Sequence, residues 1–137
     1  PWSVQVNYTY VESEINVGDD PIVTSTMRPL VGQPDHTANF VIEWAPPRYG
    51  TMVRLLYNYV GMTLHQAGGL GIPDVYQQPY QSLDLVWKQR LDFITEGLSF
   101  TLNATNLTDD RFELTGGYEQ RYQRGRGVGL GFSYTIF

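Results

Sequence analysis

The last eleven residues of the chain, GVGLGFSYTIF (127–137), alternate between apolar side chains and small or polar ones. Every second position from 128 to 136 is apolar: Val128, Leu130, Phe132, Tyr134 and Ile136. The positions between them carry Gly, Ser and Thr. Successive side chains of an extended strand point to opposite faces of a sheet, so this stretch predicts a β-strand with one apolar face.

The same alternation recurs in five earlier stretches: residues 2–10, 37–45, 51–59, 81–91 and 98–105. These stretches are rich in aromatic and β-branched residues, which favour strands. Val41, Met52 and Leu56 are apolar residues that break the pattern. The sequence therefore predicts an all-β protein of about six antiparallel strands, without a helix longer than a turn or two.

The connections between these strands alternate strictly between long and short. Segments 13–36, 61–80 and 106–126 are long, whereas PPRYG (46–50) and DFITEG (92–97) are short. In an up-and-down meander, this order places all long loops at one end of the sheet and all short turns at the other. Long structureless loops are uncommon in compact soluble domains, so the three long connections argue against a compact soluble domain.

The composition excludes several classes of protein. The length of 137 residues fits one domain or part of a larger one. A formal net charge of −5 without a block of basic residues argues against binding of nucleic acid. The chain has no cysteine, which excludes disulfides and thiolate metal sites. Its apolar runs are far shorter than the roughly 20 residues of a transmembrane helix.

Uniform strands with loops of unequal length at the two ends are typical of an outer-membrane β-barrel, in which strands of about 9–11 residues cross the bilayer. Aromatic residues fall near both strand ends, as in interfacial girdles. Trp2, Trp44 and Trp87 mark one end, and Tyr8, Tyr10, Tyr57 and Tyr59 mark the other. A soluble β-sandwich or lipocalin-like binding module is the alternative that would hide the apolar rows in its own core.

Five stretches, in this order, resemble the C-terminal end of a TonB-dependent outer-membrane receptor. They are MRPLVGQPDHTANFVIEW, RLLYNYVG, LDLVWKQRL, LSFTLNATNLTDDRFE and YQRGRGVGLGFSYTIF. The last two, at this spacing, are the specific ones, and the resemblance covers nearly the whole chain. It implies a transmembrane up-and-down barrel segment, spanning residues 1–137, whose plug domain and earlier strands lie outside this sequence.

The resemblance also implies a function and partners. The family imports scarce solutes, such as metal chelates or oligosaccharides, across the bacterial outer membrane, and TonB acts on the plug. Its barrel has 22 strands around a plugged lumen, so six strands are incomplete alone. The expected partners are outer-membrane lipid, the rest of the barrel and the plug. A structural barrel component that is completed by other chains, without transport, is the alternative function.

In this family the final strand is read by the barrel assembly machinery. The resemblance therefore assigns an assembly signal to Val128, Leu130, Phe132, Tyr134, Ile136 and Phe137. The other five residues occupy every second position from 128 to 136. Phe137 directly follows Ile136, so it is out of phase with them. Either a bulge restores the phase or Phe137 extends past the strand.

Charged residues on the polar rows are the candidate lumen-facing positions: Glu43, Arg54, Asp84, Lys88 and Arg90. They could guide a solute or hold the plug, or they could pair with one another across neighbouring strands. Aromatic residues of the long connections could bind a ligand at the external mouth or pack the loops. They are Tyr76, Tyr80, Phe112, Tyr118 and Tyr122.

We expect no metal, cofactor or catalytic site. His36, near Asp35, and His65 lie in different predicted loops without ligand spacing. The acidic residues of the segment 109–113 do not match a calcium loop, and a local turn explains them better. Gly129 and Gly131 are interpreted as permitting close packing or bending of the last strand. No nucleophile–base set indicates an enzyme.

Overall fold

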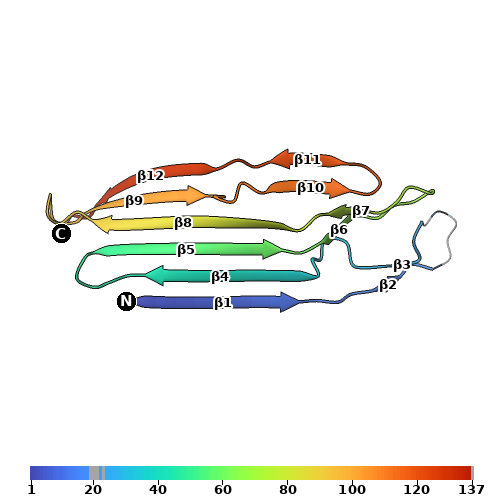
Figure 1. The fold of residues 1–137 in the computed structure, drawn as a ribbon, viewed down its shortest axis with the longest axis horizontal. Helices are drawn as coiled ribbons and strands as arrows, with labels where there is room; N and C mark the ends of the chain where they lie inside the picture. Colours follow the sequence, from blue (N-terminus) through green and yellow to red (C-terminus); the bar gives the residue numbers. More distant parts are fainter. Residues whose placement is uncertain (19–21, 23, 137) are drawn as a thin grey trace.

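Six long antiparallel strands form one sheet in the computed structural model, which describes residues 1–18, 22 and 24–136 (Figure 1). The strand order is β1-β4-β5-β8-β9-β12, so each long strand pairs with the next one along the chain. Their bounds are β1 (Trp2–Tyr10), β4 (His36–Trp44), β5 (Thr51–Val60), β8 (Tyr80–Arg90), β9 (Leu98–Thr105) and β12 (Gly127–Tyr134). The prediction of an all-β, antiparallel, up-and-down fold is confirmed.

Two smaller sheets occupy the long connections, which the sequence pattern had suggested to be loops. A four-stranded sheet has the order β11-β10-β7-β6, and a two-stranded one pairs β2 with β3. The bounds are β2 (Ile15–Asn16), β3 (Met27–Arg28), β6 (Thr63–Gln66), β7 (Val75–Gln77), β10 (Arg111–Thr115) and β11 (Gln120–Gln123). Strands of two to five residues are too short for a readable alternation.

The two ends of the long sheet differ as the connection lengths predict. The short turns after β4 and β8, together with both chain termini, lie at one end, and the two small sheets extend from the other (Figure 1). At the short-turn end the amide of Ala45 donates to the Pro1 carbonyl at 2.7 Å, and the amide of Arg90 donates to the Gly50 carbonyl at 2.7 Å. None of the described residues forms a helix that is long and apolar enough to cross a membrane.

The register aligns the apolar rows of all six strands on one side of the sheet, here called the apolar face. Trp2 lies opposite Trp44, Trp44 opposite Val53, and Val53 opposite Trp87. The row continues through Leu102 to Leu130. The tryptophans therefore gather near the short-turn end, as the sequence predicts. The opposite side, here called the polar face, carries the intervening Ser, Thr, Asn, Gln and charged residues.

Nothing in the described chain covers the apolar face. Trp2 is 66% exposed, Val6 67% and Val128 74%. The sheet is a single layer, and the buried apolar core instead lies in the small sheets, where Leu64 is 1%, Val75 3% and Leu114 3% exposed. In the long sheet only Ala104 is a buried apolar residue. The hydrophobic content of the long strands is therefore not used for packing within the described part of the chain.

The long sheet has two free edges, β1 and β12, and does not close into a barrel within the described residues. The last strand is also shorter than predicted, because β12 ends at Tyr134. The Thr135 amide still donates to the Gly97 carbonyl at 3.0 Å, but Ile136 lies beyond the strand and is 84% exposed. The prediction that places Ile136 within the strand is therefore wrong. Phe137 lies outside the described residues.

Candidate functional site

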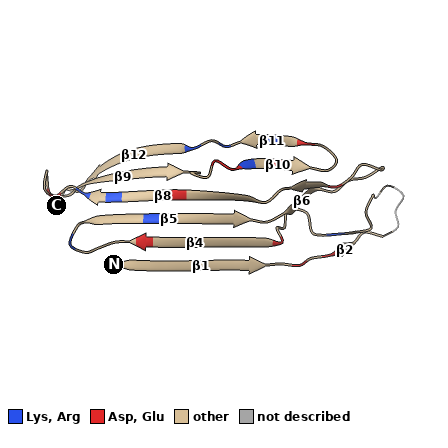
Figure 2. Ribbon diagram, viewed as in Figure 1, with Lys and Arg blue, Asp and Glu red and all other residues tan. Residues whose placement is uncertain are grey.

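The five charged candidates all lie on the polar face, on β4, β5 and β8. Figure 2 shows how sparse charges are along the long strands. The register places Glu43 directly opposite Arg54. The Arg54 Nε donates to the Glu43 Oε2 at 2.8 Å, and the Arg54 NH2 group makes a second, shorter contact with the same oxygen. The charges of these two residues neutralise each other. They therefore form the cross-strand pair that is one of the two roles the sequence pattern allows them.

The other three candidates differ in their contacts. The Asp84 Oδ1 accepts the Asn106 amide at 2.8 Å, so this carboxylate anchors the start of the connection after β9. Lys88 lies opposite Met52 and Thr101 and forms no ion pair with any residue that the structure describes. Lys88 is therefore the unpaired cation of this group.

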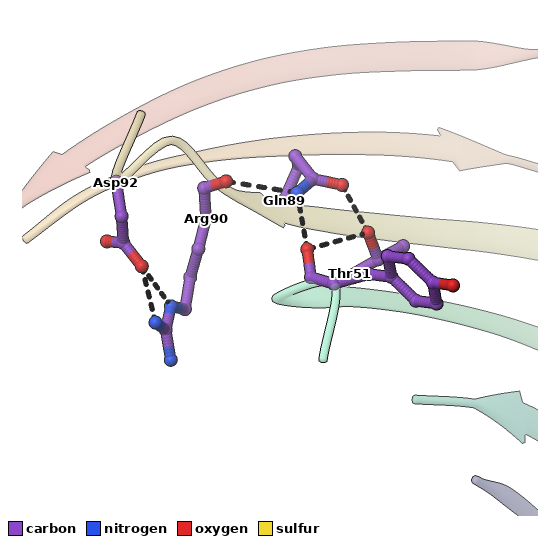
Figure 3. Close-up of polar contacts among 5 residues, drawn as sticks. Thr51, Gln89, Arg90 and Asp92 are labelled. Atoms are coloured by element: carbon purple, nitrogen blue, oxygen red, sulfur yellow. Dashed lines mark hydrogen bonds and ion pairs between the residues drawn. The ribbon is translucent and has the colours of Figure 1, made fainter. Parts of the chain in front are cut away.

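Arg90 belongs to a polar network at the short-turn end (Figure 3). Its guanidinium binds the Asp92 carboxylate, with an Nε to Oδ2 distance of 2.7 Å. The neighbouring Gln89 Nε2 donates to the carbonyls of Tyr49 and Arg90, each at 3.0 Å, and its Oε1 accepts the Thr51 hydroxyl. Gln89 thereby connects the turn after β4 to the end of β8. Because its guanidinium binds Asp92 in the turn that follows β8, Arg90 belongs to this turn and is not a free charge on the polar face.

A cavity of about 190 Å³ opens where β8 and β9 meet the long connection 106–126. Its lining combines polar, charged and aromatic side chains: Tyr80, Ser82, Asp84, Thr105, Asn106, Asp110, Phe112 and Arg124. The Arg124 guanidinium carbon lies 5.4 Å from the centroid of the Tyr80 ring. The Phe112 ring stacks on Tyr122 with a centroid distance of 4.6 Å.

The aromatic residues singled out in the long connections differ in whether they line a cavity. Tyr80 and Phe112 line the cavity above. Tyr76 lines a second cavity near β1 and β4, and the Tyr118 hydroxyl reaches the Gln66 side chain at 3.5 Å. Arg124 was not a sequence candidate, because it lies in a connection without alternation. Arg124 lies near Tyr80 because the fold brings the segment before β12 close to the start of β8.

The apolar residues that break the alternation meet one another on the polar face. Val41 lies opposite Leu56, two residue pairs along the strands from Glu43 and Arg54 and on the same face. Together with Ser3 and Gln5 these residues line a hollow of about 530 Å³. Two of the three residues that break the alternation, Val41 and Leu56, therefore form a cross-strand pair. The third, Met52, lies on the same face opposite Lys88.

The histidines and the acidic segment 109–113 make contacts of other kinds. The Tyr8 hydroxyl and the His36 Nδ1 are 2.7 Å apart, and Glu113 forms an ion pair with Arg121 at 2.6 Å. The two carboxylate oxygens of Asp110 accept the amides of Gln81 and Arg111, each at 2.9 Å. Among the residues that the structure describes, no three His, Cys, Asp or Glu side chains gather in a way that could hold a metal ion.

Gly129 and Gly131 lie on the polar face of β12, at its free edge. A Cβ atom built at either position would meet no atom within 4 Å. Close packing within the described chain therefore does not explain these two glycines. Bending of the last strand, the other interpretation from the sequence, stays a prediction.

No protein-family model matches the chain, and neither a curated protein nor a solved structure matches it.

Proposed function

We propose that the chain is part of the wall of an outer-membrane β-barrel that imports a scarce solute. The observation that carries this proposal is the uncovered apolar face, which runs without interruption across all six long strands. Exposed apolar patches beyond a few hundred Å² mark surfaces that meet a membrane or a partner. A lipid bilayer is the partner that fits a face of this kind on a single-layer sheet.

The dimensions of the sheet support a bilayer crossing. The six long strands contain 8 to 11 residues each, close to the length of about 9–11 residues that a tilted crossing needs. In lipid, every backbone group needs a partner, so the free edges of β1 and β12 require further strands. The chain thus supplies one section of a closed barrel, whose remaining strands belong to another part of the protein or to other chains.

The polar face and the external cavity support a transport role. In this arrangement Lys88 and the Glu43–Arg54 pair face the lumen, and the cavity at Tyr80 and Arg124 opens at the external mouth. The resemblance of the sequence motifs to TonB-dependent receptors favours an importer with a plug, driven by TonB. On this proposal the outward row of β12, with Phe132 at its centre, is read by the barrel assembly machinery.

The mass of the intact polypeptide, purified from the membrane fraction, separates this function from its alternative. A mass several times the 15.6 kDa of this chain supports a complete receptor with its own plug and earlier strands. A mass near 15.6 kDa contradicts the single-chain receptor. It supports instead a structural barrel that several chains complete.

Energised uptake provides the second test. A fluorescent or radiolabelled solute that accumulates in cells should no longer do so when the gene is deleted or when the proton-motive force is dissipated. Uptake that persists unchanged in the deletion strain for every solute that the cells accumulate through the outer membrane would contradict the import function.

A further inference from the structure

Strands β2 and β3 form a hairpin that belongs to neither of the two larger sheets. Among the described strands they pair only with each other, and they lie beyond the ends of β1 and β4 (Figure 1). We call them the isolated hairpin. A two-stranded hairpin on its own is at best marginally stable in water. The position of the isolated hairpin therefore depends on its contacts with neighbouring connections.

A largely buried ion pair joins the isolated hairpin to the connection between β5 and β8. The Arg28 guanidinium NH1 lies 3.6 Å from the Asp74 Oδ1, and the two side chains are only 12% and 8% exposed. The same Asp74 oxygen accepts the Gly68 amide at 2.6 Å, which holds the carboxylate within its own connection. Arg28 belongs to β3, and Asp74 directly precedes β7. The pair thus links the hairpin to the four-stranded sheet.

The two charges of this pair depend on each other. Removal of one partner of a buried ion pair leaves the other charge buried without compensation, which is strongly unfavourable. Neither Arg28 nor Asp74 forms an ion pair with any other residue that the structure describes. Loss of either charge should therefore drive the remaining one towards water, and the hairpin would have to move away to admit it.

The contact between the hairpin and its neighbour also carries a cost. The Arg28 NH1 atom is buried and has no hydrogen-bond partner among the described residues, since 3.6 Å is too long for a hydrogen bond. Leu70, whose amide donates to the Ile22 carbonyl at 2.8 Å, has a φ of +54°. Unpaired buried donors and left-handed non-glycine residues both cost free energy. Separation would hydrate the guanidinium, so the closed arrangement is only weakly favoured.

The chain on both sides of the isolated hairpin permits movement. Residues 12–14 and 29–31 lead into and out of it and belong to no strand. Gly32 follows with a φ of +78°, and a Cβ atom built there would meet nothing within 4 Å. Its amide donates to the Leu64 carbonyl at 2.8 Å, which fixes the chain to β6 at this point. Gly32 therefore marks where a movable hairpin joins a fixed part of the structure.

A cavity of about 280 Å³ lies beside these connecting segments. Ser13 and Pro29 line it from the segments that lead to the hairpin, and Leu64 and Tyr76 line it from β6 and β7. Movement of the hairpin away from the four-stranded sheet would therefore widen this cavity.

We propose that the isolated hairpin is a strap that opens and closes against the four-stranded sheet, and that the Arg28–Asp74 pair is its latch. In the closed arrangement each group compensates the buried charge of the other. In the open arrangement both groups are hydrated, and the hairpin pivots on residues 12–14 and 29–31. This inference depends on the contacts of the hairpin and not on whether the apolar face meets lipid.

The first experiment measures the position of the strap by pulsed electron paramagnetic resonance. Spin labels are attached to Thr26→Cys, beside β3, and His65→Cys, on β6, in the whole protein on a cysteine-free background. Both positions are exposed. Arg28→Met removes the cation but keeps an unbranched side chain. It should raise the population of long distances about threefold or more, because Asp74 is then buried without its partner.

Arg121→Met is the matched control. Arg121 forms an ion pair with Glu113 inside the four-stranded sheet, but this arginine is 59% exposed and does not contact the hairpin. Its replacement should leave the distance distribution as in the wild type. A distribution in Arg28→Met equal to that of the wild type, or an equal change in Arg121→Met, would overturn the proposal.

A double variant separates a latch from general damage. Asp74→Asn keeps an oxygen for the Gly68 amide and should open the strap, because the Arg28 charge loses its partner. Arg28→Met, Asp74→Asn leaves no buried charge and should return most molecules to the closed distance. A double variant as open as the single ones would contradict the coupling. Amide exchange of β10 should stay at the wild-type level, and faster exchange in the single variants would show unfolding of the sheet instead of release of a strap.

Discussion

Glu43 on β4 and Arg54 on β5 lie directly opposite each other on the polar face, and the Arg54 Nε donates to the Glu43 carboxylate at 2.8 Å. The two side chains are 24% and 43% exposed, whereas those of Asp92 and Arg90, at the short-turn end, are 39% and 68% exposed. Solvent screens both pairs, but it screens the second one more strongly. The coupling energy of Glu43–Arg54 should therefore exceed that of Arg90–Asp92.

Double-mutant cycles with Gln and Asn replacements should give a coupling of about 0.5–1 kcal/mol for Glu43–Arg54, in the range of cross-strand pairs after allowance for its exposure. The Arg90–Asp92 pair should give a coupling of about 0.3 kcal/mol or less, since exposed ion pairs contribute little. The measurement is urea-induced unfolding of the whole protein in lipid vesicles. A larger coupling for Arg90–Asp92 would show that exposure does not rank these pairs.

The four-stranded sheet β11-β10-β7-β6 should unfold independently of the long sheet when its core is weakened. Leu114 is 3% exposed and packs in the part of the molecule that contains the buried Leu64 and Val75. Leu114→Ala should cost about 2–5 kcal/mol, as other buried Leu→Ala changes do. Leu30→Ala, at a position that is 46% exposed, is the control. Limited proteolysis should cleave β10 faster in Leu114→Ala alone, and equal protection in both variants would contradict a local core.

Gly116 holds a backbone conformation that other residues adopt only with strain. Its φ is +122°, and a Cβ atom there would lie 2.0 Å from the Asp74 carbonyl oxygen. Gly116→Ala should therefore destabilise the pairing of β7 with β10 by about 1–3 kcal/mol or more. Gly129→Ala, where a Cβ meets nothing within 4 Å, should be nearly neutral. Hydrogen exchange of the β7 and β10 amides measures the effect, and equal exchange in both variants would refute the expectation.

The long strands were predictable because a period of two persists over eight or more residues in each. The register then follows, since a slip of one residue would move every apolar side chain to the other face. The pairing of Trp2 with Trp44 and of Val53 with Trp87 is the direct expression of that rule. The end of β12 was less predictable, because strand ends depend on which backbone partners remain available beyond Tyr134.

The small sheets and the cavities were not predictable for a physical reason. Leu64, Val75 and Leu114 come from three separate connections, and their contacts depend on how the long strands position those segments. Arg124 approaches Tyr80 in the same way. The alternation predicts correctly which charged residues lie on the polar face. It does not predict whether a charge is paired, as that of Arg54 is, or unpaired, as that of Lys88 is, because pairing depends on the residues opposite on the neighbouring strands.

We propose that the apolar face meets lipid, and two adjacent positions of β9 test this proposal most directly. Leu102 lies on the apolar face, between Trp87 and Leu130, and Asn103 lies on the polar face, between Val86 and Gly129. The measurement is the urea-unfolding free energy of the whole protein in lipid vesicles, for Leu102→Lys and for Asn103→Lys. We expect a loss of about 2–4 kcal/mol for Leu102→Lys, the cost of a lysine on a lipid-facing barrel surface. We expect a change within about 1 kcal/mol for Asn103→Lys, whose side chain would lie in the aqueous lumen. Equal effects of the two substitutions, or a larger loss for Asn103→Lys, would contradict the account.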